Sequence, residues 1–325
     1  MSVKYTVLEK LRTKSFSGQE LANELGVSRN SIWKAVNSLR KDGYVIEGQT
    51  NLGYKLVSFG DVLSADSVAS VCKTKDLDLY VYESISSTNT VLKEWAQKNY
   101  KEGTVIVAKE QTQGKGRLGR KFSSPSETGV YISILLRPKF SADEALSITT
   151  AAAVAVAKTL EEISGKETKI KWVNDIFIDD KKVCGILTEA SIDFETASLS
   201  YAVLGVGINL REPENGFEND IKNIAGAVFK DEIPEQIRAK TVAIFIDNFF
   251  EIYNNLPDNS FIEEYRNRSY LTGKEVNMLI GENNEKGVVV DIDDKARLLV
   301  KLETGEIKAF SAGEAMIKKG LSEKI

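Results

Sequence analysis

Residues 17–40 have the periodicity of two short helices with a tight break between them, and few folds accommodate such a pair. Ser17 and Glu20 have the spacing of a capping box at the start of the first helix. Gly26 ends that helix and Ser28 caps the second. The inward stripe of the two helices consists of Leu21, Ala22, Leu25, Ile32, Val36 and Leu39. This pattern predicts a helix-turn-helix.

A β-hairpin is predicted directly after the helix pair. Residues 44–48 and 50–57 form its strands, after Asp42 and Gly43 end the second helix. The hairpin is typical of the wing in a winged helix-turn-helix. The second helix carries residue types that contact phosphates and base edges in a DNA major groove, namely Ser28, Arg29, Asn30, Lys34 and Asn37.

The charge of residues 1–60 favours DNA binding but is modest. This segment has nine Lys and Arg against five Asp and Glu, in a chain whose net charge is −4. A helical protein-interaction module therefore remains an alternative for this domain. The small, polar residues 58–67 are expected to link it to a second domain.

The middle of the chain mixes strands and helices without a regular alternation, which predicts an α+β domain with a mixed sheet. Helices are predicted after Ser87 and over 141–164, 235–254 and 260–267. The strand-like segments are 79–83, 104–110, 129–136, 169–178, 182–190 and 201–210.

Short strands separated by Gly, Asn and Asp turns follow Leu271 and predict a small β-barrel with SH3-like topology. The chain is thus expected to join three domains of different class. Their predicted bounds are 1–60 for the winged helix-turn-helix, 61–268 for the α+β domain and 269–325 for the barrel.

Composition excludes several kinds of chemistry. The chain of 325 residues contains no histidine, which rules out Ser-His-Asp and Cys-His catalysis and the commonest general base. Cys72 and Cys184 are far apart and fit neither a disulfide framework nor a zinc site, so a reducing cytoplasm is expected. Neither a signal peptide nor a membrane-spanning run is evident, so we expect no membrane partner.

Residues 110–125, EQTQGKGRLGRKFSSP, combine three glycines with Lys115, Arg117, Arg120 and Lys121. Glycines allow a close approach of backbone to a ligand, and the cations favour an anion such as phosphate or carboxylate. The segment is not a P-loop, because that motif requires Gly-Lys-Ser or Gly-Lys-Thr at the start of a helix. A solvated basic loop explains the segment equally well when it is considered alone.

Two further segments place polar groups where a sheet normally has apolar ones. Residues 171–187, KWVNDIFIDDKKVCGIL, interrupt a buried strand pattern with Asn174 and Asp175 and then with paired lysines. Residues 203–210, VLGVGINL, end an apolar strand with two glycines and Asn209. Taken singly, the first fits a surface hairpin. The Ser-Thr-Asn run at residues 87–89 fits simple helix N-capping.

Together these motifs resemble the biotin protein ligase family, in particular its bacterial members that are also biotin-operon repressors. The resemblance extends over essentially the whole chain, from the winged helix to the carboxy-terminal barrel, and its motifs occur in the family's order. Two positions depart from the family pattern. Val173 stands where proline is usual, which should make the turn less rigid, and Phe122 stands near a usual tryptophan.

The resemblance implies a two-step reaction. Biotin and ATP form biotinyl-5′-AMP, and a lysine of a biotin carboxyl carrier protein, of acetyl-CoA carboxylase or another biotin-dependent carboxylase, then takes the biotinyl group. The cofactors implied are ATP and Mg²⁺. With biotinyl-5′-AMP as corepressor, the protein is expected to bind operator DNA as a homodimer and repress genes of biotin synthesis or transport.

The resemblance also implies roles for individual residues. Lys182, Arg117 and Arg120 are implied as catalytic, and Asp175 as the acidic group nearest to Mg²⁺. The implied biotin-binding residues are Ser87, Thr88, Asn89, Gln111, Lys115, Gly116, Arg117 and Lys182. The implied nucleotide-binding residues are Arg120, Phe122, Asn174, Asp175, Gly185 and Asn209.

Two rival hypotheses remain open on the sequence. A lipoate or octanoate ligase shares the catalytic fold and the adenylation chemistry, although it usually lacks the winged helix. A transcription regulator could instead bind a metabolite in the central domain without converting it. The cations Arg117, Arg120 and Lys182 argue against the regulator, because a sensor needs no such set beside a phosphate.

Overall fold

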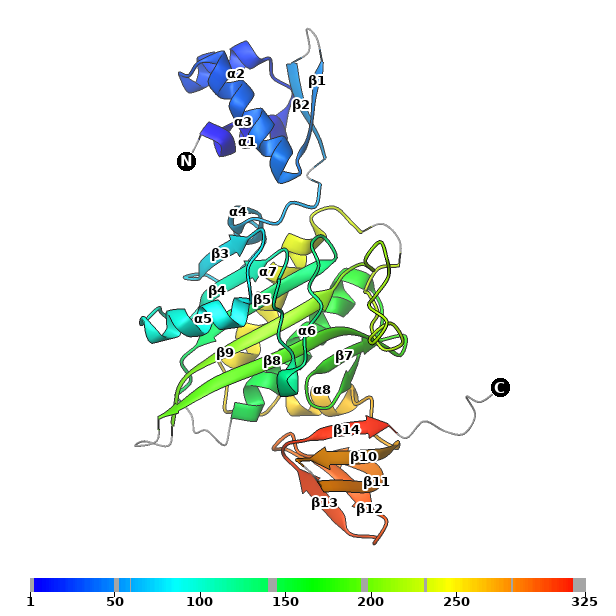
Figure 1. The fold of residues 1–325 in the computed structure, drawn as a ribbon. Coiled ribbons are helices and arrows are strands. Elements are labelled where there is room, and N and C mark those ends of the chain that lie inside the picture. Colours follow the sequence, from blue (N-terminus) through cyan, green and yellow to red (C-terminus); the bar gives the residue numbers. More distant parts are fainter. Residues whose placement is uncertain are drawn as a thin grey trace, which may run out of the picture. The chain divides into compact units, whose positions relative to one another are not determined.

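The computed structural model describes residues 3–49, 53–58, 60–139, 145–193, 198–230, 233–281 and 283–317 (Figure 1). They form two structural units. The first contains the residues up to Val71 and those of a second segment that ends at Lys240, and the second contains the rest.

The first unit begins with three helices and a two-stranded antiparallel sheet, as predicted for a winged helix-turn-helix. Ser17 Oγ accepts from the N–H of Glu20, whose carboxylate accepts from the N–H of Ser17, so the predicted capping box is present. Gly26 ends the helix with a φ of 64°. The elements are α1 (Val3–Thr13), α2 (Gly18–Leu25), α3 (Arg29–Asp42), β1 (Val45–Gln49), β2 (Gly53–Ser58) and α4 (Ala65–Ala69).

The segment predicted as a linker is more ordered than its composition suggested. Ser64 caps the short helix α4, and Val62 belongs to the apolar core of the first unit. Asp61 accepts hydrogen bonds from the backbone N–H and the guanidinium of Arg238, a buried residue at the start of α7. The expected boundary between residues 60 and 61 stays a prediction.

The second unit is built on a seven-stranded mixed sheet with the order β3-β4-β5-β9-β8-β7-β6. Strands β3 and β4 are parallel and every other pair is antiparallel. The strands are β3 (Asp78–Tyr82), β4 (Thr104–Ala108), β5 (Gly129–Leu136), β6 (Lys169–Lys171), β7 (Asp175–Ile178), β8 (Lys181–Asp193) and β9 (Ser198–Asn209). The run predicted as one strand over 169–178 is divided by a turn into β6 and β7.

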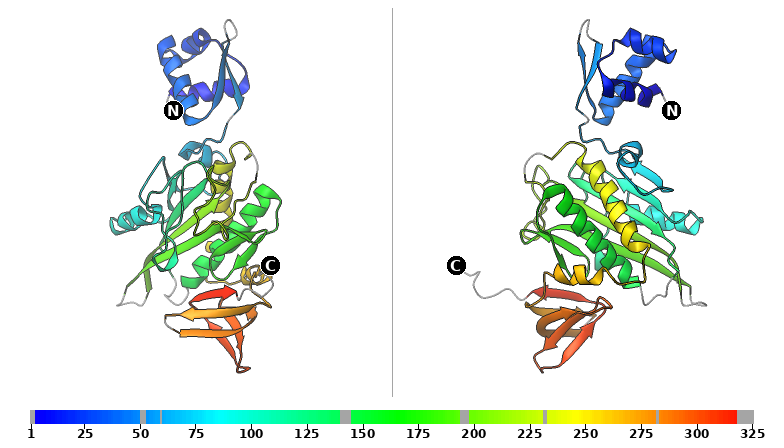
Figure 2. Two further views of the ribbon diagram at one scale, coloured as in Figure 1. Left: turned by 45° about the vertical axis from the view of Figure 1, so that its right-hand side comes forward. Right: turned by 180° about the vertical axis from the view of Figure 1, so that it is seen from behind.

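Helices cover both faces of this sheet (Figure 2). Helices α6 and α7 lie on one face, and α5 packs on β5 and β9 on the other. The Ala-rich composition of α6 allows close packing, and its alanines between Ala151 and Ala157 are fully buried. The helices are α5 (Thr88–Gln97), α6 (Ala145–Ser164), α7 (Ile237–Tyr253) and α8 (Ile262–Asn267), with a 3-10 turn, η1, at Arg117–Gly119.

The carboxy-terminal part of the second unit is a five-stranded antiparallel sheet with the order β13-β12-β11-β10-β14. It confirms the predicted small β domain. Trp172 joins it to the central domain, because its indole N–H donates to Ala296 O at 2.9 Å. The strands are β10 (Glu275–Ile280), β11 (Asn283–Ile292), β12 (Leu298–Leu302), β13 (Ile307–Phe310) and β14 (Glu314–Ile317).

Candidate functional site

A cavity in the second unit lies where β7, β8 and β9 meet the start of α5 and the glycine-rich loop. It brings together all the residues to which the sequence assigned catalysis or ligand binding. They are Ser87, Thr88, Asn89, Gln111, Lys115, Gly116, Arg117, Arg120, Phe122, Asn174, Asp175, Lys182, Gly185 and Asn209. Lys171, Phe217, Ile221, Ile224 and Glu314 also line it and were not predicted.

One end of the cavity is polar but uncharged. Ser87 caps α5, so the N-capping interpretation holds, and its side chain also lines the cavity. The N–H of Thr88 donates to Gln111 Oε1 at 2.9 Å, and Gln111 Nε2 donates to Ser124 Oγ at 3.0 Å. These contacts fix hydrogen-bonding groups in a buried position, where a neutral polar ligand can replace water.

The glycine-rich loop folds back on itself above the sheet. The N–H of Gly116 donates to Arg120 O, and the N–H of Phe122 donates to Gly114 O. A Cβ on Gly114 would lie 2.3 Å from Phe122 O, so this approach requires glycine. Arg117 reaches across the cavity and donates to Asn174 Oδ1 at 3.1 Å. The loop thus has a defined fold and holds its cations over the cavity.

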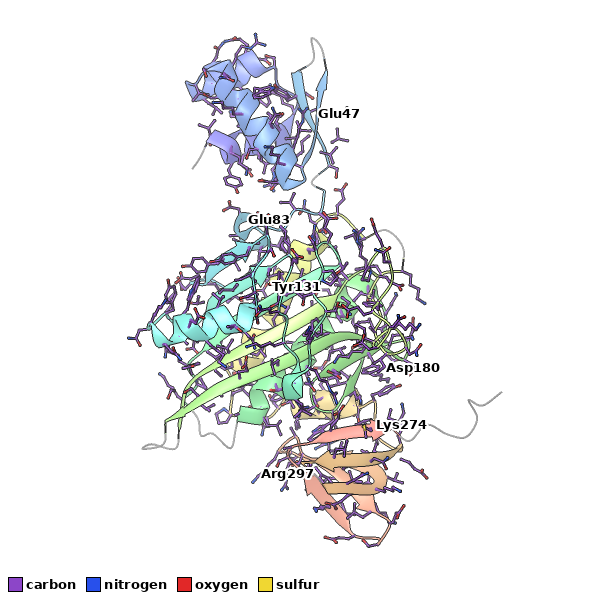
Figure 3. The ribbon with its side chains drawn as sticks, in the orientation of Figure 1. Glu47, Glu83, Tyr131, Asp180, Lys274 and Arg297 are labelled. Carbon is purple, nitrogen blue, oxygen red and sulfur yellow. The ribbon has the colours of Figure 1, made fainter. Side chains whose placement is uncertain are left out.

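The ring of Phe122 lies against two glycines of the sheet. Gly185 and Gly207 are paired across β8 and β9. A Cβ on Gly207 would lie 2.4 Å from the ring, and a Cβ on Gly185 would lie 3.0 Å from it. Tyr131, a residue of β5 that is labelled in Figure 3, lies edge-on to the same ring with 6.5 Å between the centroids. The two glycines therefore make room for the ring of Phe122 against the sheet.

Lys182 faces the cavity and its neighbour Lys181 does not. Lys182 Nζ lies 2.7 Å from Asp175 Oδ1, and the side chains of both are largely buried. Lys181 is exposed and donates to Asn223 O at 2.9 Å. A bulge at Val183 shifts the register between β7 and β8 at this point.

The chain on the far side of the cavity holds the backbone of Lys182. The N–H of Lys182 donates to Ile224 O, and Lys182 O accepts from the N–H of Gly226. Asn209 Nδ2 in turn donates to Gly226 O at 3.1 Å. These contacts fix the backbone of Lys182, which is required if its side chain is to bind a charged group at a defined place.

Two ionisable residues at the cavity were missed by the sequence argument. Burial lowers the pKa of Lys171, and the carboxylates of Asp175 and Glu314 partly offset that effect. Glu314 forms two hydrogen bonds of 2.8 Å with Arg120. These bonds lower the pKa of Glu314, against the opposing effect of burial. The carboxy-terminal domain therefore supplies an anion to the loop.

Three family models match successive parts of the chain. Residues 4–55 match the HTH domain, residues 81–209 the biotin/lipoate A/B protein ligase family, and residues 271–317 the biotin protein ligase C terminal domain. The chain is 34% identical to the bifunctional ligase/repressor BirA of Bacillus subtilis, over 91% of this chain and 92% of that protein. The chain belongs to the bifunctional ligase/repressor family.

Other members and structures of this family are similar at lower identity or over less of the chain. The bifunctional ligase/repressor BirA of Escherichia coli is 26% identical over 93% of this chain and 92% of its own. The structure of biotin protein ligase from Aquifex aeolicus in complex with biotin and ATP matches with a TM-score of 0.61 and 30% identity. That match covers 75% of this chain and 99% of the other.

The residues predicted to bind DNA lie on α3, except that Ser28 caps it, and one of them is not exposed. Arg29, Asn30 and Lys34 are exposed, and Ser28 Oγ caps the helix by accepting from the N–H of Ser31. Asn37 is partly buried, and its amide oxygen accepts from Arg40. Trp33, which the sequence analysis did not single out, is 54% exposed on the same helix.

In the described part of the chain, no helix is both long and apolar enough to cross a membrane.

Proposed function

We propose that this chain is an ATP-dependent biotin protein ligase that forms biotinyl-5′-AMP and transfers biotin to a lysine of a carrier protein. The observation that carries the proposal is the cavity itself, which combines a neutral hydrogen-bonding end with Lys182, Arg117 and Arg120. The similar Aquifex aeolicus ligase, whose structure contains biotin and ATP, supports this assignment.

The proposed chemistry requires cations at the centre of the cavity. A carboxylate oxygen of biotin must attack the α-phosphorus of ATP, where the new P–O bond replaces the bond to pyrophosphate, which leaves. The two anions repel each other strongly in a site that excludes water. We assign Lys182 and Arg117 to the oxygens of these two groups and Arg120 to the phosphates. No histidine base is needed, because a carboxylate is already a nucleophile at neutral pH.

The two ends of the cavity divide the ligand between them in this proposal. Ser87, Thr88, Asn89 and Gln111 bind the ureido ring, while Lys115 and Gly116 wrap the chain that leads to its carboxylate. The nucleotide contacts Phe122, Asn174, Asp175, Gly185 and Asn209, with the adenine beside the ring of Phe122. All of these residues line the same cavity.

The residues present fit a Mg²⁺ that is bound mainly by ATP. The described residues contain no group of three carboxylate, thiol or imidazole side chains that could hold a metal. Mg²⁺ in nucleotide sites is usually bound by one or two carboxylates and the phosphates, so Asp175 alone suffices on the protein side. Mg²⁺ would supply neutralisation of the phosphate charge. Asp175 also keeps Lys182 in position at 2.7 Å.

The transfer step is tested with a biotin carboxyl carrier domain as partner. The mixed anhydride is an activated acyl group, so the neutral amine of a carrier lysine can attack its carbonyl carbon without a covalent enzyme intermediate. The amide C–N bond forms as the C–O bond to AMP breaks, AMP leaves and the amine loses a proton. Incubation with biotin, MgATP and the carrier should add one biotinyl group to one lysine, as measured by mass spectrometry. A carrier that stays unmodified, while its acceptor lysine is intact, would contradict the proposal.

Glu314→Ala should weaken ATP binding moderately. Loss of the bidentate ion pair frees Arg120, whose side chain is 64% exposed, so the expected increase of KM for ATP is roughly two- to fivefold, as for exposed ion pairs. Steady-state kinetics at saturating biotin measures it. Glu303→Ala, an exposed carboxylate between β12 and β13, is the control and should leave KM unchanged. An equal effect of both variants would contradict the role of the Arg120 contact.

We further propose that the first unit binds operator DNA as a homodimer, with biotinyl-5′-AMP as corepressor, and represses genes of biotin synthesis or transport. Two copies would place α3 in successive major grooves. A reducing cytoplasmic location belongs to the same proposal, and the buried free thiols of Cys72 and Cys184 support it.

Lys34→Ala should weaken operator binding without relaxing its sequence preference. An exposed lysine on α3 is expected to contact a phosphate, so its loss should lower the salt slope of log Kd by about one per contact. Fluorescence anisotropy over a salt series measures this. Lys10→Ala is the matched control, because Glu24 already neutralises Lys10 at 2.7 Å. An unchanged slope for Lys34→Ala would contradict its assignment.

A further inference from the structure

A chain of buried polar groups connects the neutral end of the cavity to a carboxylate outside it. Thr88, Asn89 and Ser133 are at least 96% buried. Ser133 Oγ lies 2.7 Å from Thr88 Oγ1 and 2.6 Å from Asn89 Oδ1. Asn89 Nδ2 donates to Glu189 Oε2 at 3.0 Å and to Leu187 O at 3.3 Å. Thr88 and Asn89 line the cavity, whereas Ser133 and Glu189 do not.

Glu189 and the carbonyl of Leu187 together determine which way the Asn89 amide faces. An ionised carboxylate only accepts hydrogen bonds, and so does the carbonyl of Leu187, so both require the NH₂ group of Asn89. The amide oxygen of Asn89 must then face Ser133. Burial opposes ionisation of Glu189, but hydrogen bonds from Lys93 and Asn89 outweigh it and lower the pKa of Glu189. The carboxylate is therefore charged at neutral pH.

The direction of the remaining hydrogen bonds follows from the number of protons. Ser133 has one hydroxyl proton, and Asn89 Oδ1 can only accept it. Thr88 Oγ1 donates its own proton to Gln111 Oε1 at 3.0 Å. Ser133 approaches Thr88 Oγ1 as a donor at 2.7 Å, with the same proton that Asn89 Oδ1 accepts at 2.6 Å. No proton of Thr88 Oγ1 is therefore left for a ligand. Thr88 thus presents only lone pairs to the cavity.

We propose that Glu189 is a positioning residue that, through Asn89 and Ser133, sets Thr88 as a hydrogen-bond acceptor for an N–H group of the ligand. This inference rests on the proposed function, since the ureido ring of biotin has two N–H donors. The dithiolane ring of lipoate has none. Glu189 therefore determines specificity for a cyclic urea over a ring of similar size without a donor.

Lys93 and Gly205 fix the positions of Glu189 and Asn89, respectively. Lys93 Nζ lies 2.8 Å from Glu189 Oε1 and leaves Oε2 to Asn89. A Cβ on Gly205 would lie 2.2 Å from Asn89 Oδ1, so the glycine makes space for the amide. Each carboxylate oxygen of Glu189 thus has its own partner, which makes the effect of a neutral replacement predictable.

Glu189→Gln should reverse the chain of hydrogen bonds. Glutamine has one oxygen, which the Lys93 cation attracts, so its NH₂ group faces Asn89 and turns the Asn89 amide over, with loss of the 3.3 Å hydrogen bond from Asn89 Nδ2 to Leu187 O. Asn89 then donates to Ser133, and Ser133 donates to Thr88, which occupies a lone pair of Thr88. Losing one such acceptor should raise the Kd and KM for biotin about tenfold, with kcat changed by less than about threefold.

The double variant Lys93→Met with Glu189→Gln distinguishes this positioning role from a merely structural one, which predicts no recovery of biotin affinity. Without the cation, the glutamine oxygen can face Asn89 again, so biotin affinity should return to within about threefold of wild type. Lys93→Met alone leaves Glu189 Oε2 hydrogen-bonded to Asn89, so its biotin affinity should stay within about threefold of wild type. The affinity for lipoate, measured by competition calorimetry, should be the same in the wild type, both single variants and the double variant.

Several outcomes of these measurements would be decisive. Glu189→Gln with wild-type biotin affinity, a parallel loss for biotin and lipoate, or no recovery in the double variant would each overturn the inference. Should Glu189→Gln not fold, Thr88→Val replaces it, and unchanged biotin affinity in that variant overturns the inference as well. A wild-type protein that does not prefer biotin would contradict the proposed function instead.

Discussion

Lys182→Ala is expected to slow formation of biotinyl-5′-AMP by roughly 30- to 1000-fold, because it removes a cation from a desolvated site for a carboxylate and a phosphate. Losing one such partner costs on the order of 2–4 kcal/mol. The variant also leaves the carboxylate of Asp175 without its partner at 2.7 Å. Single-turnover measurements with excess enzyme report this step directly.

Lys181→Ala is the matched control for this prediction. Lys181 is exposed and its Nζ donates to Asn223 O outside the cavity, so its removal should change the rate by no more than a few-fold. Circular dichroism of both variants shows whether each is folded. Should Lys181→Ala be the slow variant, the assignment of Lys182 to the reacting groups is wrong.

A chain that begins at Asp61 should lose operator binding almost completely and keep adenylation. The deletion removes α3 and the wing, which make the proposed base and phosphate contacts, so affinity should fall by roughly a thousandfold or more, to no better than non-specific binding. The seven-stranded sheet and its core lie in the second unit and remain intact. The shortened chain also retains Asp61, the hydrogen-bond partner of Arg238.

Two measurements on the same sample check this prediction. Operator retention in a mobility-shift assay should disappear, while biotin-dependent pyrophosphate exchange should stay within about tenfold of the full chain. Operator binding by the shortened chain at full affinity would show that residues 1–60 are not the DNA-binding domain. Loss of exchange in a folded protein would instead show that the catalytic cavity depends on the first unit.

Local patterns were sufficient to predict most of the fold. The capping box at Ser17 and the glycine break at Gly26 act within a few residues, so the helix-turn-helix could be read directly. The apolar strands of the central domain could be predicted in the same way, because strands buried on both faces are continuous apolar runs in the sequence. The residue pattern alone predicted one strand over 169–178, because Trp172 and Val173 continue an apolar pattern while the backbone changes direction between β6 and β7. Only the family resemblance indicated a turn at Val173.

The residues that sequence reasoning missed depend on contacts between distant parts of the chain. Glu314 meets Arg120 across 194 positions of sequence, and no local pattern indicates that pairing. Lys171 resembles any surface lysine at the end of a strand until its burial is known. The orientation of Asn89 likewise depends on Glu189, a hundred residues away. Motifs marked the cavity, but the direction of its hydrogen bonds required the structure.

The most direct test of the central claim is exchange of labelled pyrophosphate into ATP by the full chain, with biotin, with lipoate and with no acid. The claim is that the cavity activates the carboxylate of biotin on ATP. It predicts rapid exchange with biotin and only background exchange with lipoate or without acid. Equal or faster exchange with lipoate would assign the chain to the rival ligase class, and no exchange with any acid would leave only a ligand-binding regulator.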